Sequence, residues 1–252
     1  MELSIIIVNW NTYNLTKKCI ESIKNLDFTY EIILINNSSN DSIKIKKLEL
    51  QYKNLKVIQN KKNTYFAKAN NIGYLHSKGK YILLLGSDTI VKDNAITKLK
   101  VFLDNNQKYS IAAPQLLNKD NSIQKSCRNF PTFINVMKSF FDLTKKSKIF
   151  GEYKLSYWDH NDSREVNQPQ ATCILIRKSV LDKYGLFDEQ FPLYFNDVDF
   201  FRKMKKHRIN TYFLSEAKVT HLYGQTTKKL GYKRKVLLYK GYIDYIKKWG
   251  LL

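Results

Sequence analysis

The sequence predicts an α/β fold with a mostly parallel central sheet flanked by helices. Two observations lead to this class. The first half of the chain alternates short, continuously apolar runs with longer amphipathic stretches, which is the pattern of parallel strands joined by helices on both faces of a sheet. Polar residues rich in Asn, Ser and Asp follow several of the apolar runs. At 252 residues, the chain is long enough for one sizeable domain of this kind.

Five apolar runs in the first half are predicted as strands, and amphipathic stretches between them as helices. After the first run, Leu15, Cys19 and Ile23 recur at i, i+4 and i+8, with Leu26 extending the same face. This spacing predicts a helix with one buried side. The predicted strands are 4–8, 31–35, 55–58, 81–85 and 110–113, and the further helices are 42–52, 67–77 and 94–105.

The pattern loosens between residues 118 and 166, where many aromatic residues and the basic run 145–148 occur. We expect a helical or loop excursion over one sheet face here, and no separate domain. The prediction is one domain over 1–252, made of an N-terminal half (1–117), a smaller second half (118–226) and a basic C-terminal helix (227–252). Later elements are predicted as a strand at 170–177, a helix at 197–206, strands at 211–214 and 217–220, and a helix at 233–249.

The net charge of +21 indicates anionic partners such as nucleic acid, an acidic membrane surface or phosphorylated substrates. A compositional bias toward Lys, Asn and Ile explains the same charge, so the charge alone selects no partner. The tail 233–249 has two interpretations: a helix that packs on the domain, or an amphipathic helix in peripheral contact with an anionic membrane.

Cysteine usage favours a reducing, cytoplasmic compartment. Cys19, Cys127 and Cys173 are widely spaced and odd in number, which matches neither a disulfide framework nor a zinc site. The chain enters an apolar strand almost at once, so no signal peptide is expected. No apolar run approaches the roughly 20 residues that a membrane-spanning helix requires.

The polar segments 8–11, 36–39 and 86–88 lie at the predicted carboxyl ends of three strands. Ligands of open α/β sheets bind at this edge, so these segments are the first candidates for a site. None contains Gly-x-Gly-x-x-Gly or a Gly-Lys-Ser phosphate loop. The sequence therefore does not support a dinucleotide fold or a P-loop.

Seven short motifs, in order along the chain, resemble those of family 2 inverting glycosyltransferases, and in particular a branch of bacterial rhamnosyltransferases. The resemblance runs from residue 5 to about residue 226. It implies the GT-A fold, which has a Rossmann-like sheet, with residues 1–117 as the nucleotide-sugar-binding half and residues 118–226 as the smaller acceptor and catalytic half. The motifs are Ile-Ile-Val-Asn-Trp-Asn (6–11), Asn-Asn-Ser-Ser-Asn-Asp (36–41), Ala-Asn-Asn-Ile-Gly (69–73), Leu-Leu-Leu-Gly-Ser-Asp-Thr (83–89), Gly-Leu-Phe-Asp-Glu-Gln-Phe (185–191), Phe-Asn-Asp-Val-Asp-Phe (195–200) and Val-Thr-His (219–221).

The resemblance implies a Mn²⁺ or Mg²⁺ ion held by Asp88 and His221. The family motif is Asp-x-Asp or Asn-Pro-Asp, and here Gly86 leaves Asp88 as its only carboxylate. A hard divalent cation also takes oxygen ligands from a diphosphate, so one aspartate can suffice. Without the resemblance, Asp88 is a turn residue and His221 a histidine of the core.

The resemblance also implies that Asp197 is the general base, which removes the proton of the acceptor hydroxyl. Asn196 stands where the family has glutamate. Asp199 is interpreted as structural, because a carboxylate is favoured near a helix N-terminus. Arg202, three residues on, is a candidate partner for Asp199.

The implied nucleotide-sugar pocket is rich in asparagines, which are also frequent helix caps. Asn36 replaces the family aspartate that accepts the ring N–H of the base, and an amide oxygen can accept the same bond. Tyr65 stands where the family usually has glycine, which changes the shape of that loop. The predicted nucleotide-sugar-binding residues are Val8, Asn9, Asn11, Asn36, Asn70, Ser87 and Asp88.

The resulting hypothesis is a metal-dependent inverting glycosyltransferase, cytoplasmic or at the inner face of the cell membrane. It transfers a sugar, with rhamnose from dTDP-rhamnose favoured over a UDP-sugar, to a cell-surface glycan or lipid-linked acceptor. The basic, glycine-bearing segment 223–235 is either a lid over the donor phosphates or a solvated loop. Two alternatives remain open, namely a non-catalytic family member and a basic nucleic-acid-binding protein.

Overall fold

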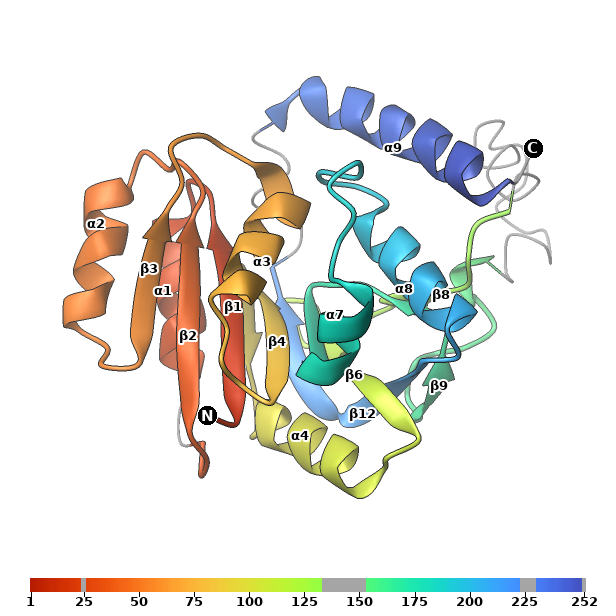
Figure 1. Ribbon diagram of the computed structural model, residues 1–252. Helices are drawn as coiled ribbons and strands as arrows, with labels where there is room; N and C mark the ends of the chain where they lie inside the picture. Colours follow the sequence, from red (N-terminus) through yellow and green to blue (C-terminus); the bar gives the residue numbers. More distant parts are fainter. Residues whose placement is uncertain (24–25, 133–152, 223–229, 251–252) are drawn as a thin grey trace.

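The computed structural model describes residues 1–23, 26–132, 153–222 and 230–250, and is built around one mixed ten-stranded sheet (Figure 1). The main strand order is β3-β2-β1-β4-β11-β6-β12-β5, with β7 beside β6 and β9 beside β12. The strands are β1 (Leu3–Asn9), β2 (Tyr30–Asn36), β3 (Leu55–Gln59), β4 (Tyr81–Gly86), β5 (Thr89–Val91), β6 (Tyr109–Leu117), β7 (Ile123–Gln124), β9 (Arg164–Val166), β11 (Cys173–Arg177) and β12 (Asn210–His221). A separate two-stranded sheet pairs β8 (Cys127–Arg128) with β10 (Gln168–Pro169).

The N-terminal half confirms the predicted alternation of parallel strands and helices. Strands β1, β2, β3 and β4 all pair in parallel, and their carboxyl ends therefore meet at one edge. The helices of this half are α1 (Tyr13–Ser22), α2 (Ser42–Lys47), the 3₁₀ turn η1 (Leu48–Leu50), α3 (Tyr65–Leu75) and α4 (Ala95–Asn105). The helix predicted over 42–52 is thus a short α-helix that tightens into a 3₁₀ turn.

Both faces of the sheet are buried, which explains why its strands are continuously apolar. Ile5 and Ile7 belong to one hydrophobic cluster, whereas Ile6 belongs to the cluster on the opposite face. Helix α3 packs so closely on β1 that a Cβ at Gly73 would lie 2.4 Å from Ile6 Cγ2. A glycine is therefore required for this close packing of helix and strand.

The buried face of α1 includes the predicted Cys19 and extends to residues that were not predicted, while the predicted Ile23 is buried just past the end of the helix. Thr16, Cys19 and Ile20 are buried, while Leu15 is only half-buried. Thr16 Oγ1 donates a hydrogen bond to the buried Asn9 Oδ1 at 2.9 Å, so a polar contact, which hydrophobic periodicity does not register, is part of this buried face.

The second half adds strands of mixed direction. Strand β11 is antiparallel to β4 and β6, whereas β12 is parallel to β6. The two strands predicted at 211–214 and 217–220 are one strand, β12, because a bulge between Leu214 and Lys218 shifts its register without ending it. The central sheet remains mostly parallel in its N-terminal half, as expected for this α/β class.

Several short elements escaped prediction, because strands of two or three residues and a helix of seven carry too little periodicity. These are β5, β7, β8, β9, β10 and helix α7 (Lys178–Tyr184). Within the predicted excursion, Trp158 packs against Phe213 at a centroid distance of 5.1 Å. The basic run 145–148 and Phe133, Phe140, Phe141 and Phe150 lie outside the described residues.

Two helices complete the described chain: α8 (Asn196–Lys206) and α9 (Lys233–Trp249). In Figure 1, α9 lies across one side of the molecule, above α8. Its buried residues are Gly241, Tyr242, Tyr245 and Ile246. The tail therefore packs on the domain, which was the first of its two interpretations. No helix in the described part of the chain has both the length and the apolar composition needed to cross a membrane.

Candidate active site

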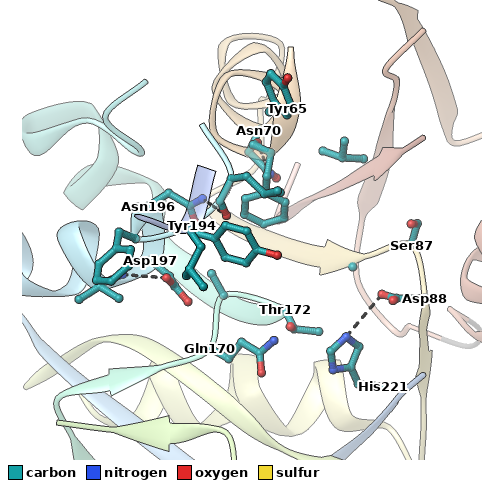
Figure 2. A pocket seen from close by; sticks show the side chains of 18 of the residues that line it. Tyr65, Asn70, Ser87, Asp88, Gln170, Thr172, Tyr194, Asn196, Asp197 and His221 are labelled. Atoms are coloured by element: carbon teal, nitrogen blue, oxygen red, sulfur yellow. Dashed lines mark hydrogen bonds and ion pairs between the residues drawn. The ribbon is translucent and has the colours of Figure 1, made fainter. Parts of the chain in front are cut away.

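A cavity of about 580 Å³ lies at the carboxyl ends of β1 and β4. Val8 and Trp10 come from the end of β1, and residues 86–88 follow β4. The N-terminal turns of α3 and α8 supply further walls, and Arg234 and Leu238 of α9 contribute from the opposite side. Side chains from remote segments thus converge on one space, as Figure 2 shows.

Asp88 and His221 form a buried pair at one end of this cavity. The Nε2 atom of His221 lies 3.6 Å from Asp88 Oδ1. Strand pairing brings them together, because His221 is opposite Thr89 in the β12–β5 ladder. The N–H of Leu222 also donates to the carbonyl of Asp88 at 2.9 Å. The two predicted metal ligands, 133 positions apart in the chain, therefore meet as neighbours.

Gln124 orients the imidazole of this pair. Its Oε1 lies 2.7 Å from His221 Nδ1, while its amide nitrogen donates to Asn118 Oδ1 at 2.9 Å. With this amide orientation, Nδ1 carries the proton and Nε2 presents its lone pair toward Asp88. Burial lowers the pKa of His221, against the opposing effect of the Asp88 carboxylate. The ring is therefore held neutral.

The donor atoms of this pair suit a divalent cation. A carboxylate oxygen and a neutral imidazole nitrogen are both ligands of Mn²⁺, and the second ring nitrogen is held by a side-chain acceptor, as ligating histidines usually are. Within residues 1–23, 26–132, 153–222 and 230–250, no group of three or more His, Cys, Asp or Glu side chains could hold a metal ion. Asp88 and His221 are thus a two-ligand set that fits the ion.

Asp197 lies at the other side of the cavity in Figure 2, on the first turn of α8. Its Oδ1 accepts a hydrogen bond from the N–H of Val198 at 2.9 Å. Burial raises the pKa of Asp197 above its ordinary value, although the N–H groups of Val198 and Ala171 and the charge of Arg128 oppose the shift. A carboxylate with a raised pKa in a cavity has the properties of a general base.

A model of the family described as "Glycosyl transferase family 2" matches residues 4–185, which is most of the chain and includes β1 to β11. The chain belongs to glycosyl transferase family 2. Membership agrees with the sequence prediction and favours an enzyme over the nucleic-acid-binding alternative.

Curated relatives match this chain over part of their own length. The chain is 24% identical over 218 residues to the low-salt glycan biosynthesis hexosyltransferase Agl10 of Haloferax volcanii, covering 83% of this chain and 63% of that protein. It is 32% identical over 102 residues to the glycosyltransferase GlyG of Streptococcus pneumoniae serotype 4, covering 38% of this chain and 33% of that protein. The chain thus spans less than two thirds of the length of these relatives.

Solved structures confirm the GT-A fold expected for this family 2 chain. GalNAc-T7 with UDP, GalNAc and Mn²⁺ superposes with a TM-score of 0.67 at 16% identity, covering 89% of this chain and 44% of the other. TarS 1–349 of S. aureus in complex with UDP-GlcNAc superposes with a TM-score of 0.58 at 17% identity, covering 90% and 61%. At such identities, the likeness establishes the fold alone.

Three positions where the family has a carboxylate hold Gly86, Asn196 and Asn36 in this chain, and each residue has specific local contacts. A Cβ at Gly86 would lie 3.2 Å from Asp88 Oδ1, so the glycine leaves room for the Asp88 carboxylate. Asn196 is 3% exposed and donates to the carbonyl of Leu193 at 2.7 Å. The third position, Asn36, lies in a buried network.

Three of the predicted nucleotide-sugar-binding residues make hydrogen bonds within the fold and do not line the cavity. Asn9 and Asn36 are both fully buried, and Asn9 Nδ2 donates to Asn36 Oδ1 at 3.1 Å. Asn36 Nδ2 in turn donates to Gln59 Oε1 at 2.7 Å. Asn11 Oδ1 accepts the N–H of Asn40 at 2.8 Å. None of these three asparagines lines the cavity; they join β1, β2 and the loops that follow them.

The other predicted residues do line the cavity: Val8, Asn70, Ser87, Asp88, Asp197 and His221. Asn70 is held by a hydrogen bond from its Nδ2 to the carbonyl of Phe66 at 2.8 Å. Tyr65 also lines the cavity, with a φ of +60° at the first residue of α3. The left-handed backbone explains why glycine is usual at this position of the family.

Asp199 is fully buried but does not face the cavity. The predicted pairing of Asp199 with Arg202 is wrong. Asp199 is bonded to Lys248 and Trp249 of α9, and Arg202 donates to the hydroxyl of Tyr245 at 2.8 Å. Contacts between helices thus replace the expected pair within one helix.

Several lining residues were not predicted. Arg128, Gln168, Gln170 and Thr172 come from the short β8 and β10 strands and the turn into β11, where no spacing marks a site. Gln168 is 5% exposed, and its Oε1 has no hydrogen-bond partner among the residues that the structure describes. Part of the predicted lid, 223–229, lies outside the described residues.

Proposed function

We propose that this chain is a metal-dependent inverting glycosyltransferase that moves a sugar from a nucleoside diphosphate to an acceptor hydroxyl. One observation carries the proposal. A single cavity holds the buried Asp88–His221 pair on one side and the carboxylate of Asp197 on the other. A cation-binding pair suits the diphosphate of a donor, and a separate carboxylate suits the acceptor.

Asp197 takes the proton of the acceptor hydroxyl as that oxygen attacks the anomeric carbon on the face opposite the leaving group. Since burial raises the pKa of Asp197, its carboxylate is more basic than that of an exposed aspartate. The N–H of Val198, which donates to Asp197 Oδ1, keeps this carboxylate in a fixed orientation. The positioned base contributes roughly 10²–10⁴-fold in rate.

Asp88 and His221 would hold Mn²⁺ or Mg²⁺ beside the donor. The ion, when bound, neutralises the negative charge that develops on the departing diphosphate. Arg234 lines the same cavity, and its guanidinium is suited to the phosphate oxygens. Val8, Asn70 and Ser87 supply wall contacts for the nucleotide sugar.

The donor class rests on two lines of support. The motif order resembles the rhamnosyltransferase branch, which favours dTDP-rhamnose. The structural neighbours are complexes with UDP, or with UDP-GlcNAc, and the relative Agl10 is named a hexosyltransferase, which supports a hexose donor more generally. We therefore propose dTDP-rhamnose first and a UDP-sugar second, with a cell-surface glycan or lipid-linked saccharide as acceptor at the inner face of the cell membrane.

Calorimetric titration with UDP and with dTDP, each with and without Mn²⁺, tests the donor site. We expect binding that requires Mn²⁺, with a preference for one nucleotide that identifies the donor class. A donor panel with crude glycolipid acceptors then tests turnover through the nucleoside diphosphate released. Binding without turnover of any donor would favour the non-catalytic alternative, and absence of metal-dependent binding would overturn the proposed site.

A further inference from the structure

Helix α9 has a second apolar face, which is largely exposed to solvent. Tyr242, Tyr245 and Ile246 bury the inner face of the helix against the domain. On the outer side, four apolar or aromatic side chains remain exposed to solvent. They are Tyr232 (79% exposed), Val236 (48%), Tyr239 (49%) and Ile243 (50%).

These four side chains form one continuous stripe, which we call the outer stripe. Their spacing of four, three and four residues places them within about 60° of one another around the helix. Of the eleven large hydrophobic residues exposed in the described part of the chain, five lie at 232–243. Such clustering indicates an interaction surface, since isolated exposed apolar residues are scattered on ordinary surfaces.

Lysines border the outer stripe. Lys233, Lys240 and Lys247 recur every seven residues, so they form a row along one side of it. Within the described residues, Lys233, Lys235 and Lys247 make no ion pair. Asp244 is the single acidic residue of α9 and is paired with Lys240. The surface is therefore apolar along its centre and strongly positive at its border.

We propose that the outer face of α9 docks on an anionic lipid bilayer, with the outer stripe entering the headgroup region and the lysines facing anionic headgroups. An apolar stripe bordered by Lys on a helix is the pattern of an interfacial helix. A second copy of the chain is a poorer occupant, because pairing two such helices would bring their lysine rows together without counter-charges.

Two contacts make α9 suited to dock without leaving the domain. Lys248 Nζ lies 2.8 Å from Asp199 Oδ1 and from Asp188 Oδ2. These ion pairs hold the C-terminal end of α9 on the rest of the domain. Near its other end, Arg234 and Leu238 line the cavity. The helix thus separates the cavity from the bilayer by its own thickness. If the proposed function holds, a lipid-linked acceptor would reach Asp197 from the membrane side.

The test is flotation of the full chain with vesicles of phosphatidylcholine alone, and of equal parts phosphatidylcholine and phosphatidylglycerol. We expect binding to the anionic vesicles only, weakened by added salt. The pair Lys233→Ser/Lys247→Ser should lower the partition coefficient roughly 30-fold, at about 1 kcal/mol for each lysine. The pair Val236→Ser/Ile243→Ser should lower it at least about tenfold.

Matched controls lie on α2, at the far left of Figure 1, and on η1 and the turn that follows it. Ile43→Ser/Leu50→Ser removes two exposed apolar side chains, and Lys47→Ser/Lys53→Ser removes the same charge. Both controls should bind vesicles like wild type, and all variants should keep the wild-type Tm.

Equal losses in control and α9 variants, or no binding of the wild type to anionic vesicles, would overturn the proposal. So would a wild-type dimer, by light scattering, that the stripe variant dissociates, because a second copy would then cover this face. The assay uses neither nucleotide nor turnover, so its failure is distinct from failure of the proposed function.

Discussion

Asp199 of α8 and Lys248 of α9 form an ion pair, with distances of 2.8 and 2.9 Å from Lys248 Nζ to the two carboxylate oxygens. Trp249 Nε1 donates to the same carboxylate at 2.9 Å. Burial lowers the pKa of Lys248, but its hydrogen bonds to Asp188 and Asp199 outweigh this effect and raise the pKa. This pair joins the C-terminal helix to the helix that bears Asp197, two residues before Asp199.

Lys248→Met should destabilise the protein by about 3 kcal/mol, because it leaves the fully buried Asp199 carboxylate with an uncompensated charge. The side chain of Lys248 is 30% exposed. The expected loss of stability is therefore at the low end of the range for breaking a buried ion pair. Urea unfolding measures the effect. Lys240→Met breaks the exposed pair with Asp244 and, as the control, should cost less than about 1 kcal/mol. Equal effects of the two variants would contradict the inference.

Asp197→Asn should lower turnover by roughly 10²–10⁴-fold while leaving donor binding intact. The amide retains the acceptor oxygen for the N–H of Val198 but cannot take a proton. Initial rates and UDP titration separate the two effects. Turnover equal to that of the wild type would show that another group is the base.

The pH dependence of the same residue has a definite sign. Because burial raises the pKa of folded Asp197, the folded state binds its proton more tightly than the unfolded chain does. The contribution of Asp197 to stability therefore falls as pH rises from about 3.8, the ordinary aspartate pKa, through the raised folded value. Above this window, Asp197→Asn should be at least as stable as wild type. Unfolding at pH 4 and pH 8 measures the difference, and a variant destabilised more at pH 8 than at pH 4 would contradict the sign.

Gln124→Leu should weaken Mn²⁺ binding by roughly 10–100-fold, because it removes the acceptor that fixes the His221 ring. Titration of Mn²⁺ in the presence of UDP provides the measurement. Gln124→Glu keeps an acceptor oxygen for Nδ1–H and should bind the ion more tightly than Gln124→Leu does. If the two variants bind Mn²⁺ equally, the orientation of His221 does not depend on this contact.

Tyr65→Gly should be more stable than Tyr65→Ala by about 1 kcal/mol, because residue 65 has a left-handed backbone. Both variants lose the ring that lines the cavity, so their UDP affinities should match. Denaturant unfolding of the pair isolates the backbone effect. At Lys18, an exposed position inside α1, the order should reverse, with alanine the more stable. The same order at both positions would argue against strain at Tyr65.

Hydrophobic patterning in the N-terminal half was sufficient to predict β1 to β4 and their helices. Ile5, Ile6 and Ile7 are all buried because helices cover both faces of the sheet, so the run of apolar residues corresponds directly to one strand. The patterning did not predict the polar contact of Thr16 with Asn9, nor that β12 continues through a bulge. Both depend on contacts with a strand, which is β1 for Thr16 and β6 for the bulge.

For the site, local motifs predicted which residues gather at the sheet edge but not which of them face the cavity. Val8 and Asn9 are adjacent, yet Val8 lines the cavity and Asn9 is fully buried, because successive strand residues point to opposite sides. Nothing near Gln124 in the sequence marks it as the partner of His221, since β7 is only two residues long.

The sequence by itself determined the α/β class, the family and the positions along the chain of the strands whose ends form the site, because these depend on local periodicity and short motifs. Only the tertiary structure decided that Asp88 meets His221, that Asn36 is buried and that Asp199 holds α9. The physical reason is that hydrogen bonds and ion pairs between remote segments are chosen by packing, which brings together side chains that no local pattern relates.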